Sequence, residues 1–297
     1  MEGSMGFFLA LLSSAAFGLI PLFSLPLLHE GMSAECVLFY RFLFGSLALA
    51  VILVLRNERL AAPAHELAKL AVFSVMYALA ALLMFRGFDY LPSGVASTLQ
   101  FLYPLMVMII MVVFFHEKPS FFTVLSVLMA IVGVFLLSSG EGEGSVSMKG
   151  ILLLLLSALC NAIYICGLHA ARIRSISGLS ITFWVLLFGM AASLINALAS
   201  GSFQWLHSWS ETALAVLLAV ITAAVSNLAL VLAIQRIGST MTAILGVMEP
   251  VTAVAVGILV FDEPATAGVF AGVAVICAAV VLVMVGPLMA ERRKSRG

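Results

Sequence analysis

An acidic residue followed directly by a proline stands in the middle of one of the most apolar stretches of the chain. Glu249 and Pro250 lie within Ile244–Pro264, near the middle of an expected membrane span over 239–261. An ionised carboxylate at the bilayer centre costs at least about 2.5 kcal/mol. Glu249 must therefore be neutral, paired or facing water. Its chemistry would be contact with a substrate amine or exchange of a coupling proton, and the structural alternative is a protonated glutamate bonded to a neighbouring helix.

Two prolines, Pro104 and Pro250, each fall near the midpoint of an apolar stretch. Because proline has no N–H group, the carbonyls of Gln100 and Gly246, four residues earlier, lose their helical hydrogen bonds. Such carbonyls can face a cavity in the membrane. We predict a pair of kinked helices that act as hinge or gate, with Pro21 as a further bending point. A fixed kink is the structural alternative.

Arg41 is the one lysine or arginine in the interior of an expected span, since the others lie in connections or within three residues of a span end. Its guanidinium could contact a substrate carboxylate, snorkel to the interface, or pair with Asp89 or a backbone carbonyl. Other polar and aromatic residues also lie deep in the spans, where they usually satisfy a neighbouring helix. Together they also suit a pocket for a flat or amphipathic solute. The predicted substrate-binding set is Arg41, Tyr77, Gln100, Tyr103, Asn161, Tyr164, Trp184, Asn227 and Glu249.

The composition indicates that a lipid bilayer surrounds these residues. The chain has 297 residues, of which 64% are hydrophobic and only 9% charged. Soluble domains are about 45–50% apolar and about 25% charged. The formal net charge is zero, so the chain lacks the basic field that nucleic acid requires. Its four cysteines fall in apolar runs without a metal-ligand spacing, and we expect no metal and no cofactor.

Ten apolar windows are long enough to cross a membrane, since a spanning helix needs about 20 residues. The expected spans are 6–28, 34–56, 67–86, 93–115, 120–138, 149–171, 178–200, 212–235, 239–261 and 265–289. The connections between them are short. We therefore predict an all-α integral membrane protein of ten transmembrane helices with no soluble domain.

The distribution of lysine and arginine predicts the orientation. Eleven of the fourteen lie on the side of the N-terminus: Arg56, Arg59, Lys69, Lys118, Arg172, Arg174, Arg236, Arg292, Arg293, Lys294 and Arg296. Cytoplasmic loops carry an excess of these residues. We therefore expect a multi-pass protein of a bacterial cytoplasmic (inner) membrane, with both termini in the cytoplasm.

The chain divides into two similar halves, joined by a linker over 138–147, SSGEGEGSVS. An offset of 146 residues brings prolines and acids of the halves into register. The superposed pairs are Ser93/Ser239, Pro104/Pro250, Phe115/Phe261 and Glu117/Glu263. Because each half has five spans, the halves must insert in opposite orientations, as in secondary transporters. We predict two inverted five-helix repeats, 1–140 and 148–291, around a central cavity.

Several motifs occur together in a combination that is typical of a known family. They are Arg41-Phe42, the stretch ALLMFRGFDYLPSGVASTLQFLYP ending at Pro104, Glu117 after the fourth span, Glu249-Pro250, and Asp262-Glu263-Pro264. In this combination the chain resembles the drug/metabolite transporter superfamily, in its ten-helix EamA-type branch, over essentially its whole length. The resemblance implies export or exchange of small metabolites, among them amino acids, drugs and nucleotide sugars, by alternating access. The chain departs from the pattern because Tyr103 stands opposite Glu249 in the repeat alignment.

The residues and the resemblance together predict a secondary transporter and not an enzyme, since we find no nucleophile–base set. We favour export of amino acids, including aromatic ones, or similar amphipathic compounds. A proton-coupled multidrug exporter and a gradient-driven facilitator of the same solutes are the alternatives. A nucleotide-sugar transporter is less favoured, because phosphates need several buried cations, and so is a non-transport membrane subunit. The expected partners are a small-molecule substrate, the lipid bilayer and, for coupling, protons. We expect a monomer that binds no nucleic acid.

Overall fold

The computed structural model describes residues 2–58, 60–114, 121–139, 147–171 and 176–294. Several residues used in the sequence analysis lie outside these ranges. They are Glu117, residues 140–146 of the linker, Phe115, Arg59, Lys118, Arg172, Arg174 and Arg296.

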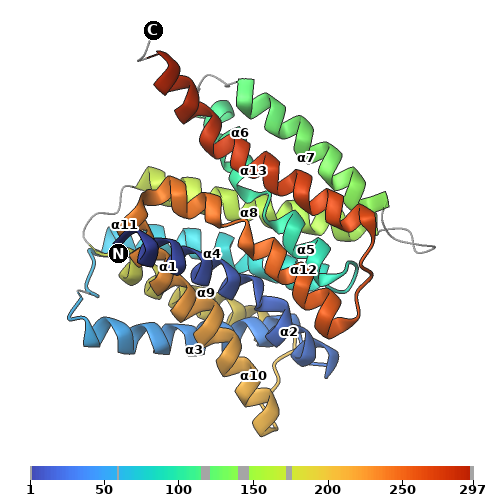
Figure 1. The fold of residues 1–297 in the computed structure, drawn as a ribbon. Helices are drawn as coiled ribbons and strands as arrows, with labels where there is room; N and C mark the ends of the chain where they lie inside the picture. The colour runs from blue at the N-terminus through green and yellow to red at the C-terminus, as the bar shows by residue number, and fades with distance from the viewer. Residues whose placement is uncertain (1, 59, 115–120, 140–146, 172–175, 295–297) are drawn as a thin grey trace.

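Thirteen α-helices and one π-helical segment make up the described part of the chain (Figure 1). Helices dominate because lipid offers backbone groups no hydrogen-bond partner, so each span must satisfy its own. In chain order the elements are α1 (Glu2–Gly18), α2 (Ile20–His29), α3 (Ala34–Leu55), α4 (Ala64–Gly87), α5 (Ser93–Gln100), α6 (Tyr103–Phe114), α7 (Phe121–Ser139), α8 (Met148–Ala171), α9 (Gly178–Ala199), α10 (Trp209–Ala219), η1 (Val220–Val225), α11 (Ser226–Leu245), α12 (Met248–Phe261) and α13 (Ala267–Lys294).

These elements form ten spans, four of which are composite. The first consists of α1 and α2, and the fourth of α5 and α6. The eighth runs through α10, η1 and the first part of α11, which then turns at Gly238, where φ is 79°. The ninth consists of the rest of α11 and α12. A positive φ of this kind favours glycine, which explains how one helical run serves two spans.

Length and hydropathy agree with this count. Within the described residues, seven helical segments are long and apolar enough to cross a membrane. Three shorter apolar segments complete the ten: Val124–Leu137, Met248–Phe261 and Ala267–Val283. The predicted all-α, ten-span fold is confirmed.

The two halves are related by a pseudo-twofold symmetry, which is visible in the pairs of helices that are in contact. The second span packs on the seventh (α3 on α9), the fifth on the tenth (α7 on α13), and the fourth on the ninth (α5 on α12). The third packs on the sixth (α4 on α8), and the first packs correspondingly on the eighth (α1 on α11). Figure 1 shows α7 and α13 side by side at one edge of the bundle. Exchange of the halves preserves this set of pairs.

Small residues let the paired helices approach closely. A Cβ atom on Gly272 in α13 would lie 2.9 Å from the carbonyl oxygen of Gly133 in α7. Close approach through glycine is typical of helix packing in membranes, where van der Waals contact replaces the hydrophobic effect. All four cysteines are buried and form no disulfide, so they pack as small apolar side chains.

Candidate functional site

A cavity of about 530 Å³ lies between the two halves. Among the described residues, eight of the ten spans contribute to its lining, and α7 and α13 do not. The pairing described above leaves those two helices together at the edge of the bundle. The site is therefore built from the first four spans of each half.

Eight of the nine residues predicted to bind substrate line this cavity. They are Arg41, Tyr77, Gln100, Tyr103, Asn161, Tyr164, Asn227 and Glu249. They come from six different spans, so only the folded chain brings them together. Their role in binding a substrate stays a prediction.

Trp184 is the exception, because it lies outside the lining. Its neighbours Ile181, Thr182 and Val185 face the cavity. The Trp184 indole N–H instead donates to the carbonyl of Leu60 over 2.9 Å. Its ring stacks on Phe188, with 5.6 Å between ring centroids. The sequence placed Trp184 in the cavity, whereas in the structure it bonds to the loop between α3 and α4.

Among the described residues that line the cavity, one is basic and one is acidic. Arg41 is only 3% exposed and lines the cavity, so it does not snorkel to the interface. Its Nε atom has no hydrogen-bond partner among the described residues. The ion pairs of the described chain are Arg56–Glu58 and Arg86–Glu35, and neither includes Arg41 or Glu249. A buried donor without an acceptor is costly, so the Arg41 guanidinium can bind an acceptor group of a ligand.

Gln100 offers a second polar atom that lacks a partner. The residue is 7% exposed and lines the cavity. Its Oε1 atom accepts no hydrogen bond from the described residues. Buried amide oxygens are normally satisfied. Gln100 therefore provides an acceptor for a donor group that enters the cavity.

Tyrosine rings form part of the cavity wall. Tyr77 of α4 and Tyr164 of α8 lie with their ring centroids 5.1 Å apart. The Tyr103 ring lies edge-on to Phe101, at 6.3 Å and an interplanar angle of 88°. Aromatic rings of this kind provide large apolar contact area together with polar hydroxyl groups. The wall suits a solute that has both a flat apolar part and polar groups.

The three prolines predicted as hinges all follow interruptions of a helix. The breaks lie at Leu19, at 101–102 and at 246–247, each within three residues of Pro21, Pro104 or Pro250. The sequence predicted a kink, whereas the structure has a full interruption. The reason is that proline fits the first turn of a helix, where its missing N–H has no partner to lose. Whether the breaks act as hinges stays a prediction.

Ser14 fulfils a role that the sequence analysis missed. Its Oγ donates to the Gly246 carbonyl over 2.8 Å, the group that Pro250 deprives of its normal helical partner. The Glu249 N–H donates to the same oxygen over 3.0 Å. Gly18 lets α1 approach this break, because a Cβ there would lie 2.5 Å from the Glu249 carbonyl oxygen. A serine in an apolar helix was the only available signal, and it did not identify the partner.

The cavity reaches the surface on one side of the protein. Its lining extends to Gly178, which is exposed at the start of α9, on the side where the N-terminus lies. Toward the other side the lining ends at the buried side chains of Ile20 and Met84. Among the described lining residues, the cavity therefore reaches an exposed residue on the side of the N-terminus, which we call the mouth side, and ends at buried residues on the other, closed side.

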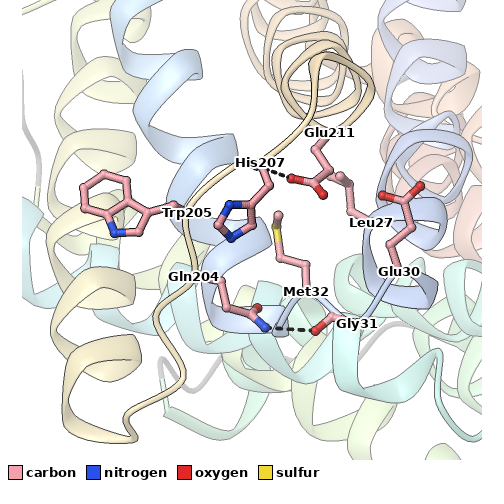
Figure 2. Close-up of a pocket in the computed structure, with 8 residues that line it drawn as sticks. All are labelled: Leu27, Glu30, Gly31, Met32, Gln204, Trp205, His207 and Glu211. Atoms are coloured by element: carbon pink, nitrogen blue, oxygen red, sulfur yellow. Dashed lines mark hydrogen bonds between the residues drawn. The ribbon is translucent and has the colours of Figure 1, made fainter.

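A second, smaller pocket of about 90 Å³ lies among loops on the closed side (Figure 2). The Gln204 side-chain amide donates to the Gly31 carbonyl over 3.1 Å, and the His207 backbone N–H donates to Glu211 over 2.6 Å. The first contact fastens the loop between α9 and α10 to the turn between α2 and α3, and the second joins that loop to the first turn of α10. The pocket is thus explained by loop packing.

A ten-span helical membrane protein with inverted halves around a central cavity has the architecture of a secondary transporter. A model of the EamA-like transporter family matches the chain twice, over residues 4–139 and 148–285. The chain belongs to the EamA-like transporter family, within the drug/metabolite transporter superfamily. The predicted family resemblance is confirmed.

Relatives add little about the substrate. The chain is 28% identical over 182 residues to an uncharacterized transporter, YdfC, of Bacillus subtilis (strain 168). That match covers 58% of the chain and 60% of the length of the relative. A solved structure, described as a crystal structure of a protein, superposes on this chain with a TM-score of 0.65 at 16% identity. The superposition covers 97% of this chain and 98% of the chain in that structure. This likeness extends to the fold alone.

Proposed function

We propose that the chain is a secondary transporter that exports amino acids, including aromatic ones, or similar amphipathic metabolites by alternating access. It works as a monomer in a bacterial inner membrane with both termini in the cytoplasm. In that orientation the cavity is open to the cytoplasm, which is the side where an exporter takes up its solute. The transporter class follows from the family, and the substrate class rests on the cavity.

One observation carries the substrate proposal: the cavity holds one acid and one base that form no ion pair with each other. The Glu249 carboxylate can accept from a solute ammonium group, and the Arg41 guanidinium can donate to a solute carboxylate. Gln100 Oε1 is a further acceptor for the ammonium group. A zwitterion satisfies these groups at once, whereas a simple cation leaves Arg41 without an acceptor.

The size and wall of the cavity suit such a solute. About 530 Å³ lies within the range of about 300–1,000 Å³ found for small-molecule sites. Tyr77 and Tyr164 provide a surface on which an aromatic or aliphatic side chain can lie. By contrast, Arg41 is the sole lysine or arginine in the described lining. Nucleotide sugars are therefore disfavoured, because a diphosphate needs several cationic donors.

The paired breaks support alternating access. The fourth and ninth spans are interrupted at nearly equivalent repeat positions, at 101–102 and 246–247. A helix half beyond such a break can move without bending a continuous hydrogen-bonded helix. We propose that Pro104 and Pro250, together with Pro21, keep these breaks in place, and that the halves reorient about them.

A proton-coupled multidrug exporter is the second candidate, because Glu249 is the acidic residue of the described cavity lining. In that case protonation of Glu249 competes with binding of a cationic solute. A gradient-driven facilitator of amino acids would use the same cavity without a coupled proton.

Counterflow in proteoliposomes tests these functions. Labelled phenylalanine, leucine and a cationic dye are each offered at pH 6 and pH 8, with protein-free liposomes as the blank. We expect saturable amino acid counterflow that Tyr164→Phe alters and Trp184→Phe leaves unchanged, since only Tyr164 lines the cavity. Dye movement without amino acid movement would select the multidrug alternative. Failure of every solute to move would overturn the proposed function.

A further inference from the structure

The side of the protein opposite the cavity mouth is held closed by a contact between the two halves. The Glu263 carboxylate accepts from the backbone N–H of Ser93 over 2.5 Å and from that of Gly94 over 3.1 Å. These are the first two residues of α5. Glu263 follows α12 and lies 170 residues further along the chain than Ser93. One side chain thus joins an outer end of the first half to an outer end of the second.

Backbone geometry places this carboxylate on α5. Helix α12 ends at Phe261, and Asp262 adopts a left-handed conformation with φ 52° and ψ 32°. The Glu263 N–H then donates back to the Gly257 carbonyl over 3.0 Å. The chain therefore reverses at the end of α12, in the manner of a helix C-terminal capping turn. The reversal directs the side chain of Glu263 along α12 toward α5.

Glycines make the contact tight. A Cβ on Gly257 would collide with the Glu263 carboxylate. A Cβ on Gly94 would lie 2.8 Å from the Cα of Val254 in α12. Both helices therefore pack backbone against backbone at this end, as Figure 1 shows for α5 and α12.

The joined segments are the closed-side halves of the two broken spans. Helix α5 precedes the break at 101–102, and α12 follows the break at 246–247. On the mouth side no comparable packing joins α6 to the ninth-span part of α11 within the described residues. The cavity lining extends on that side to Leu168 of α8 and to the exposed Gly178 of α9. Contact on one side and separation on the other is what a transporter open to a single side requires.

We propose that Glu263 is a latch: its carboxylate, bound to the N-terminus of α5, favours the conformation that is closed on this side and open at the mouth. The N-terminus of a helix has free N–H groups and a partial positive charge, so an ionised carboxylate binds it well. The latch must release before α5 and α12 can separate. Glu263 is thus a positioning residue of the transport cycle, and it need not touch the solute. This inference rests on the proposed alternating access.

Glu263→Gln tests the latch because it removes the charge and keeps the shape of the side chain. The readout is a cysteine introduced by Met84→Cys, since Met84 lines the closed end of the cavity. The native cysteines are buried, and the parent chain measures their background. A membrane-impermeant thiol reagent is applied from each side, using vesicles of the two orientations. Glu30→Gln is the matched control, an exposed carboxylate on the same closed side.

We expect the Met84→Cys side chain to react mainly from the mouth side in the parent. Glu263→Gln should raise the rate at which this cysteine is labelled from the closed side about tenfold, and lower the rate of labelling from the mouth side. Glu263→Asp, which keeps the charge but is shorter, should give an intermediate shift, and Glu30→Gln none. If Glu263→Gln does not fold, the Glu263→Asp comparison decides alone.

Unchanged rates from both sides would overturn the latch. A rise from both sides together would also overturn it, because it would indicate local loosening without a shift between two conformations. Labelling requires no solute. Failure of the proposed function would therefore appear separately, as absence of counterflow in the parent, while the pair of labelling rates still reports on the latch.

Discussion

Substitution of Arg41 by glutamine should change which solutes the transporter prefers. Arg41 is 3% exposed, lines the cavity and has an Nε without a partner in the described chain. In our proposal its partner is the carboxylate of the solute. Glutamine keeps a hydrogen-bonding amide but removes the charge and the paired donors of the guanidinium group.

The size of the effect follows from the lost interaction. A hydrogen bond to a charged group contributes about 1.5–3 kcal/mol, and about 1.4 kcal/mol corresponds to a tenfold change in affinity. Arg41→Gln should therefore weaken the binding of phenylalanine by about 10- to 150-fold. The affinity for phenethylamine, which has no carboxylate, should change little. The melting temperature should change little, since Arg41 forms no ion pair with a described residue that its removal would break.

The assay is competition against labelled phenylalanine in proteoliposomes. Three competitors separate the roles: phenylalanine, phenethylamine and 3-phenylpropionate, which has no amine. Glu249→Gln should weaken the binding of phenylalanine and phenethylamine, which carry an amine, and leave the binding of 3-phenylpropionate unchanged. Trp184→Phe is the control, because Trp184 lies outside the cavity. If Arg41→Gln weakened the binding of phenylalanine and of phenethylamine equally, the reasoning would be refuted and Arg41 would be a structural residue.

Three further predictions follow from the same geometry. Glu249→Gln should abolish any proton movement coupled to solute flux, measured with a pH-sensitive dye inside the vesicles; persistent coupling would place the proton site elsewhere. Pro250→Ala restores an N–H that can bond the Gly246 carbonyl, so a continuous helix can replace the break at 246–247. The counterflow rate should then fall, while thermal stability should change little, because proline already fits the first turn of α12; an unchanged rate would argue against a hinge. Gly257→Ala should lower stability by about 1–3 kcal/mol through overpacking against Glu263. Gly178→Ala, whose nearest atom is 3.8 Å away, should be neutral by the same thermal measurement.

Much of the site was predictable from residue type and depth. Glu249, Arg41 and the tyrosines are too polar to face lipid, so an apolar sequence that keeps them at mid-span depth directs attention to an interior cavity. Pro104 and Pro250 were recognisable because the repeat offset aligns them. The structure adds that each lies just after the start of a new helix, which the sequence could not distinguish from a kink.

Which way a span faces was not predictable in the same way. In water, the polar face of a helix marks its exposed side, but lipid and protein interior are both apolar, so the pattern gives little information. Trp184 shows the consequence: it belongs to a span that lines the cavity, yet its side chain bonds to Leu60 outside the cavity. Rotation about the helix axis depends on packing between helices.

The sequence by itself determined the membrane environment, the ten spans, the two similar halves and the depth of the acidic and basic residues. Each depends on local composition or on a repeat along the chain. Only the tertiary structure decided which residues share the cavity, that Ser14 satisfies the Gly246 carbonyl, and that Glu263 caps α5. These are contacts between residues up to 232 positions apart. They depend on how closely helices approach and how they are rotated, which side-chain packing sets and local composition does not.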